Sequence, residues 1–112
     1  MGLGAARREG TMVIVAVSIS PVGEGVSVGR YVAEAVRILR EQKSVNYRVD
    51  PMFTTLEGDL DETLALVRRM HEAVFKAGAR RVSTLIKVDD RRDRSARMAD
   101  KISSVERTLD GR

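Results

Sequence analysis

The chain has 112 residues, a formal charge of +4 and no cysteine. This length is typical of one domain with a single hydrophobic core. An apolar share of 43% with 32% charged residues indicates a globular protein and not a disordered one. The lack of cysteine excludes disulfides and thiolate metal sites, and it fits a reducing compartment. No apolar run approaches the roughly 20 residues that a membrane-spanning helix needs. We therefore expect a cytoplasmic protein.

Residues 1–11 are small, glycine-rich and charged, and they show no periodic pattern. We expect a flexible N-terminal extension followed by one domain over residues 12–112. Residues 12–20 predict the clearest strand, because they are rich in Val and Ile and are followed by Pro21 and Gly23. Strand alternation divides them into an apolar face and a face of small or polar residues. The first face holds Val13, Val15, Val17 and Ile19, and the second holds Ile14, Ala16, Ser18 and Ser20.

A first helix is predicted from a cap at Ser27 to about residue 42. Its apolar positions follow helical spacing and form one stripe. That stripe consists of Val28, Val32, Ala35, Val36 and Leu39. Residues 45–49 and 53–56 then predict two short strands, and Asp50 with Pro51 indicates a turn between them.

The second predicted helix begins at a capping box formed by Asp59 and Glu62, and it ends before Gly78. Its apolar side is expected to hold Leu60, Leu64, Val67, Met70 and Val74. Residues 81–89 alternate as a fourth strand, with Val82, Thr84, Ile86 and Val88 on one face. A third helix follows from the spacing of Met98, Ile102, Val105 and Leu109, and Ser95 is its candidate cap.

This order of elements is β-α-β-β-α-β with an added C-terminal helix. It predicts an α+β ferredoxin-like sandwich, in which two helices cover one face of a four-stranded antiparallel sheet. The other sheet face must then be solvated or covered by another subunit. Because the strand faces contain Leu85 and Leu56 as well as several small hydroxyl residues, we expect a homo-oligomer formed through the sheet or through strand edges.

The sequence offers no coherent set of acid, base and nucleophile, so we expect neither catalysis nor a metal or cofactor. His71 is the only histidine, and Phe75 stands where a zinc protease needs its second one. We favour a hydrogen-bonded histidine at the margin of the core over a titrating group in a pocket. Residues 21–27 lack a dinucleotide fingerprint, which leaves a flexible turn or an anion-binding turn. Arginines interleave with Asp89, Asp90 and Asp93, which favours local ion pairs over a cation site.

Basic residues gather toward the two ends of the chain, but no aromatic residues lie among them. Single-stranded nucleic acid is bound on such aromatic platforms. We therefore interpret the arginines as a solvated basic surface and do not expect a nucleic-acid partner.

Several sequence blocks together resemble a family of small microbial proteins that were first catalogued as uncharacterised and later described as thiamine-binding. The resemblance extends from about Met12 to Leu109. It implies ferredoxin-like subunits assembled as dimers of dimers. It also implies binding of thiamine, or of its hydroxymethylpyrimidine portion, without known turnover. The blocks that carry it are residues 19–23, 25–27, 31–36, 51–58, 71–75 and 81–91.

Thiamine has a cationic thiazolium ring and an aminopyrimidine edge with donors and acceptors. A site for it needs a carboxylate, some hydroxyls and a flat apolar wall. Glu57 is the candidate carboxylate, and Phe53 or Met52 the candidate wall. Hydroxyls are available from Ser18, Ser20, Thr54, Thr55 and Ser83, and Ser27 and Lys87 complete the candidate ligand-binding set.

Two points limit these site assignments. Alternation allows only one of Thr54 and Thr55 to face a given pocket, and Ser18 and Thr54 suit a structural role equally well. Lys87 opposes a purely cation-seeking site unless it pairs with an acid or binds a phosphate. The alternative function is a structural or regulatory oligomeric module whose pocket is empty or binds an anion.

Overall fold

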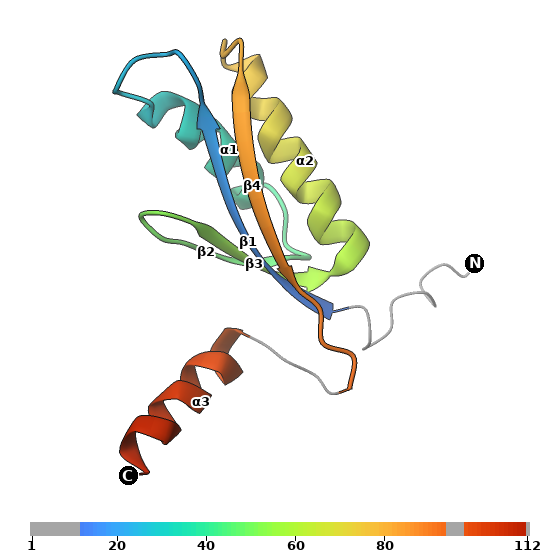
Figure 1. Ribbon diagram of the computed structural model, residues 1–112. Coiled ribbons are helices and arrows are strands. Elements are labelled where there is room, and N and C mark those ends of the chain that lie inside the picture. Colours follow the sequence, from blue (N-terminus) through green and yellow to red (C-terminus); the bar gives the residue numbers. More distant parts are fainter. Residues whose placement is uncertain (1–11, 94–97, 112) are drawn as a thin grey trace, which may run out of the picture.

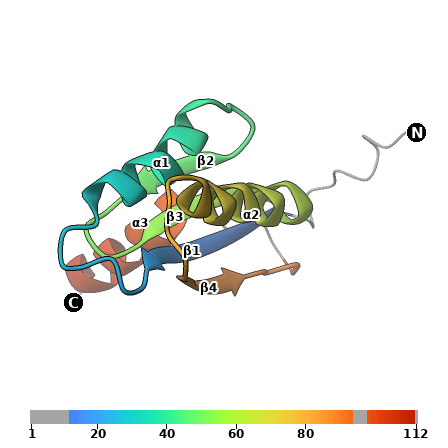
Figure 2. The same ribbon diagram turned by 90° about the horizontal axis from the view of Figure 1, so that it is seen from above.

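The computed structural model describes residues 12–93 and 98–111. Four strands form one antiparallel sheet in the order β2-β3-β1-β4. Helices α1 and α2 lie side by side on one face of it (Figures 1 and 2). The predicted ferredoxin-like sandwich is confirmed. The elements are β1 (Met12–Pro21), α1 (Gly29–Arg40), β2 (Asn46–Val49), β3 (Thr54–Asp59), α2 (Leu60–Lys76), β4 (Val82–Asp89) and α3 (Met98–Asp110). The predicted N-terminal extension lies outside the described residues.

The hydrophobic core lies between the sheet and the pair α1 and α2. Val13, Val15 and Val17 of the central strand β1 are at most 2% exposed, so the predicted apolar face of β1 is confirmed. Burying one such side chain stabilises the fold by about 1.5–3 kcal/mol. The buried apolar partners of these residues are Tyr31, Ala35, Leu39, Val45, Leu56, Leu66, Val67, Met70, Val74 and Ala79.

The start of α1 differs from the prediction. The residue at the N-cap is Val28, and Ser27 lies exposed in the preceding loop without capping the helix. The helix begins at Gly29 because the carbonyl of Val28 accepts from the backbone N–H groups of Tyr31 and Val32. The loop before it is held by Glu24, which accepts from the hydroxyl of Tyr31 at 3.2 Å.

The predicted apolar stripe of α1 is wrong at Val32, which is 40% exposed. Ala35 and Leu39 are buried as predicted, and Tyr31 is buried in place of Val32. The aromatic body of Tyr31 enters the core while its hydroxyl donates to Glu24. In the same way, Leu64 of α2 is 38% exposed, and the buried side of that helix includes Thr63 and Leu66.

The predicted boundaries of α2 are confirmed at both ends. Asp59 accepts from the backbone N–H of Glu62 at 3.1 Å, and Gly78 follows the helix with a φ of 113°. Strand β3 is longer than predicted and leads directly into α2. Its pairing with β1 continues as far as Asp59, opposite Met12, which extends the strand beyond the apolar residues that predicted it.

Helix α3 is present as predicted, but it does not join the core. No described residue of α3 is buried, and Ile102, Val105 and Leu109 are all at least 44% exposed. The helix lies apart from α1 and α2, beyond the opposite face of the sheet (Figures 1 and 2). Its candidate cap, Ser95, lies outside the described residues. Within residues 12–93 and 98–111, none of the helices has the length and apolar character that a membrane crossing requires.

Candidate functional site

The sheet face that α1 and α2 leave uncovered, here called the open face, gathers most of the predicted site residues. Val13, Val15 and Val17 point into the core, so the alternate residues of β1 belong to the open face. On the neighbouring strands the same face contains the residues that pair with these alternate positions. Six candidates therefore share one surface: Ser18, Ser20, Thr55, Glu57, Ser83 and Lys87.

The other three candidates lie elsewhere. Thr54 is paired with Val17 and belongs to the helix side of the sheet, so the prediction that Thr54 and Thr55 diverge is confirmed. Ser27 is exposed in the loop before α1. Phe53 precedes β3, and its carbonyl accepts from the N–H of Asp50 at 3.1 Å in the turn after β2. The structure thus does not bring Ser27 and Thr54 to the open face.

Glu57 is the distinctive group of the open face. It is only 6% exposed, although carboxylates are almost never buried without partners. One carboxylate oxygen, Oε1, accepts from the side-chain amide of Asn46 at 2.9 Å. The other, Oε2, accepts from the backbone N–H of Met98 at 2.9 Å. Asn46 was not among the predicted site residues, and its signal is its position opposite Glu57 when β2 and β3 are paired.

The contact with Met98 brings the first residue of α3 onto the sheet. The N-terminus of a helix attracts negative charge, so the Glu57 carboxylate suits this position. A second contact joins Lys101 Nζ to Asp89 Oδ2 at 2.6 Å, with side chains 51% and 44% exposed. Such an exposed ion pair contributes about 0–1 kcal/mol. The attachment of α3 is therefore polar, and it includes one buried carboxylate.

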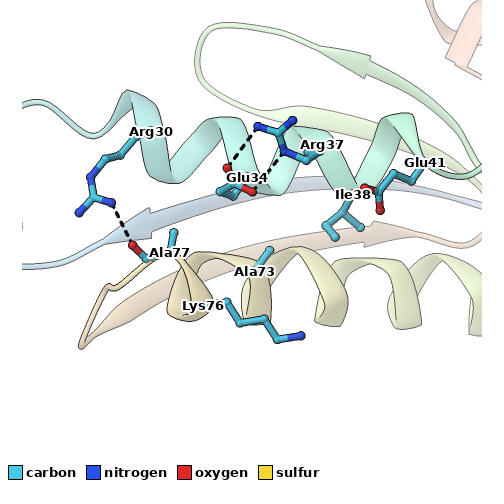
Figure 3. A pocket seen from close by; sticks show the side chains of 8 residues that line it. All are labelled: Arg30, Glu34, Arg37, Ile38, Glu41, Ala73, Lys76 and Ala77. Carbon is cyan, nitrogen blue, oxygen red and sulfur yellow. Dashed lines mark hydrogen bonds and ion pairs between the residues drawn. The ribbon is translucent and has the colours of Figure 1, made fainter.

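Grooves in the surface lie on the helix side of the sheet, along α1 and α2. Figure 3 shows a groove of about 440 Å³ between α1 and α2. In it, Arg30 donates to the carbonyl of Ala77 at 3.0 Å, and Arg37 pairs with Glu34 at 3.2 Å. The hydrogen bond that Arg37 donates to Glu34 raises the pKa of Arg37. Both signs of charge line this groove, so it does not form a basic surface for nucleic acid.

A neighbouring groove of about 650 Å³ shares part of the same lining. Three of its side chains, Arg68, Arg69 and Lys76, are cationic, and Glu72 is the acidic one. None of these four residues was among the predicted site residues, and all occupy exposed positions on α2.

His71 lies on the helix side, away from Glu57. Its Nδ1 is 2.6 Å from the hydroxyl of Thr84, and its ring meets the edge of Phe75 with centroids 5.3 Å apart. These contacts favour the interpretation of a hydrogen-bonded histidine at the margin of the core. Since α2 and the open face lie on opposite sides of the sheet, His71 and Glu57 do not converge into an acid–base pair.

The acidic residues after β4 form local ion pairs. Asp90 pairs with Arg92 at 2.8 Å and Asp93 with Arg91 at 2.6 Å. The hydrogen bond from Arg92 lowers the pKa of the Asp90 carboxyl. In the part of the chain that the structure describes, no group of three or more His, Cys, Asp or Glu side chains is placed to hold a metal ion.

Comparison with known proteins agrees with this architecture. Residues 15–106 match the family described as thiamine-binding protein. A UPF0045 protein of Staphylococcus xylosus is 43% identical over 88% of this chain and 95% of its own length. The UPF0045 protein YqgV of Bacillus subtilis is 40% identical over 88% of this chain and 98% of its own.

Solved structures show the same fold. A hypothetical protein of Methanocaldococcus jannaschii superposes with a TM-score of 0.79 at 32% identity, covering 86% of this chain and 97% of its own. A Thermotoga maritima protein described as a putative thiamine biosynthesis/salvage protein has a TM-score of 0.72 at 20% identity. That match covers 84% of this chain and 98% of the other. At this identity the likeness concerns the fold alone.

Proposed function

Because this chain belongs to the family of thiamine-binding proteins, we propose that it binds thiamine or its hydroxymethylpyrimidine portion without converting it. The observation that carries the proposal is the buried Glu57 carboxylate on a sheet face rich in hydroxyls. A carboxylate accepts hydrogen bonds and does not donate them, so it selects a ligand with N–H groups or positive charge.

Each part of the ligand has a chemical counterpart on the open face. The amine of the pyrimidine can donate to Glu57, while Thr55, two residues away on the same face of β3, offers a hydroxyl to a ring nitrogen. An apolar wall is available from Leu85, which is paired with Ser18 and is 61% exposed. The sequence analysis had assigned that wall to Phe53 or Met52. Lys87 of the same face suits a phosphate ester of the ligand better than the thiazolium cation.

We further propose that the working unit is a homo-oligomer, a dimer of dimers. An open sheet face with an exposed Leu85 and a helix α3 with an apolar exposed side are both surfaces that another subunit can bury. Sedimentation velocity and light scattering measure the mass in solution directly. A monomer at micromolar concentration would contradict this part of the proposal.

The ligand proposal is tested by calorimetric titration with thiamine, hydroxymethylpyrimidine and thiamine phosphate. The decisive variant is Glu57→Gln, which keeps the size of the side chain and removes its charge. A hydrogen bond to a charged group contributes about 1.5–3 kcal/mol, so we expect roughly a tenfold or greater loss of affinity. The matched control is Glu72→Gln, which changes an exposed carboxylate on the helix side. No binding heat at millimolar ligand, or equal loss in both variants, contradicts the proposal.

A second candidate is an interaction module that binds an anion in the helix-side groove. It is favoured by Arg68, Arg69 and Lys76 around a groove with a single acidic residue in its lining. Inorganic phosphate and thiamine separate the two proposals in a thermal-shift measurement. Stabilisation by phosphate that disappears in Arg69→Gln, together with no response to thiamine, supports the anion-binding module.

A further inference from the structure

The backbone N–H at the N-terminus of α3 donates to Glu57, the carboxylate that the proposed ligand needs. Oε2 of Glu57 accepts from the backbone N–H of Met98 at 2.9 Å, and Oε1 accepts from Asn46 at 2.9 Å. With these contacts in place the Glu57 residue is only 6% exposed. A carboxylate oxygen can accept two hydrogen bonds, but so little of Glu57 is exposed that a ligand donor reaches Oε2 only after Met98 has moved away.

We propose that α3 and the aminopyrimidine of the ligand compete for Glu57, so that docking of α3 closes the ligand site and ligand binding releases the helix. This inference rests on the proposed function, and it adds a regulatory element to the same site. In this exchange, an N–H of the ligand replaces the N–H of Met98 as the donor to the Glu57 carboxylate. It also keeps the buried carboxylate satisfied in both states, which avoids the cost of an unpaired buried charge.

Within one subunit, helix α3 is suited to such an exchange because its release uncovers none of that subunit's buried apolar side chains. None of its described residues is buried, and its apolar residues Ile102, Val105 and Leu109 are already exposed. Its ion pair between Lys101 and Asp89 is also open to solvent on both sides. A helix packed through apolar contacts would oppose displacement by a small ligand far more strongly.

The test removes the backbone N–H of Met98 that donates to Glu57 and leaves the rest of the chain unchanged. Met98 is the first residue of α3, where proline is well tolerated because its missing N–H has no partner within the helix. Met98→Pro therefore deletes the donor to Glu57 and preserves the helix. Met98→Ala is the matched control, since it removes the same side chain and keeps the N–H. Thiamine is titrated into the full chain and both variants by calorimetry, and hydrogen exchange of the α3 amides is followed with and without thiamine.

We expect Met98→Pro to bind thiamine roughly tenfold more tightly than Met98→Ala, because the docked state no longer competes. Thiamine should also speed hydrogen exchange in α3 of the unmodified chain. Equal affinities of the two variants, or weaker binding by Met98→Pro, overturn the competition while leaving the proposed function intact. Weaker binding by Met98→Pro would indicate that docked α3 is part of the ligand site and stabilises the bound ligand. Absence of binding heat in all three proteins refutes the proposed function itself and the competition with it.

Discussion

Gly58 occupies the tightest point in the contact between β3 and α2, and replacing it with alanine tests that packing. A Cβ at this position would lie 3.0 Å from Oγ1 of Thr63 and 3.3 Å from a methyl of Val45. Both neighbours are at most 3% exposed, so neither can turn into solvent to make room. We expect Gly58→Ala to destabilise the domain although alanine suits a strand better than glycine.

The magnitude follows from two opposing terms. Forcing one carbon into a well-packed core costs about 1–3 kcal/mol. Replacing glycine within a strand returns about 0.5–1 kcal/mol, because the unfolded chain becomes less flexible. The net loss is therefore about 1–2 kcal/mol, which corresponds to a fall in Tm of roughly 5–10 °C for a domain of this size.

Urea unfolding followed by far-ultraviolet circular dichroism measures the loss. Gly29→Ala is the matched control, because a Cβ at Gly29 meets no atom within 4 Å and should leave stability equal or slightly higher. Removing the hydroxyl in the double variant Gly58→Ala/Thr63→Ala should recover part of the loss, since contacting residues couple by about 0.5–3 kcal/mol. An unchanged urea midpoint in Gly58→Ala, or strict additivity in the double variant, would refute the reasoning.

Three further outcomes are expected. Thr63→Val should raise the free energy of unfolding by about 1 kcal/mol in urea unfolding, because the buried Oγ1 has no hydrogen-bond partner among the described residues. Thr84→Val should lower it by about 1 kcal/mol by leaving His71 unpaired, and the double variant His71→Leu/Thr84→Val should be more stable than Thr84→Val alone. Arg92→Gln should return the pKa of Asp90 upward to its ordinary value in an NMR titration. This sign follows because a depressed carboxyl pKa marks an ion pair that forms above that pKa and is lost as the pH falls through it.

Most of the fold was predictable from local signals. Alternation of Val13, Val15 and Val17 predicted the buried face of β1, and Asp59 with Glu62 predicted the start of α2. These signals succeed because each depends on neighbours a few residues away. The burial of Tyr31 in α1 was not predicted. Which of two adjacent helix residues enters the core depends on whether the polar end of its side chain finds a hydrogen-bond partner.

The candidate site was predictable only in part, for a related reason. Alternation placed Ser18, Ser20, Thr55 and Glu57 on one face once the strand order was known. The partners of Glu57, however, come from β2 and from α3, far along the chain. No local pattern in the sequence reports that Met98 reaches a carboxylate on β3. The grooves between α1 and α2 are tertiary features of the same kind.

The strand order has a consequence for how the chain acquires its structure in the cell. Strand β1 is central to the sheet, yet one of its two partners is β4, where Val88 lies opposite Val15. Synthesis delivers β1 first of the four strands and β4 last, so the valine-rich strand emerges long before its second neighbour exists. Such long-range pairing slows folding and leaves the nascent strand exposed to association with other chains. The sheet is completed only after β4 has left the ribosome.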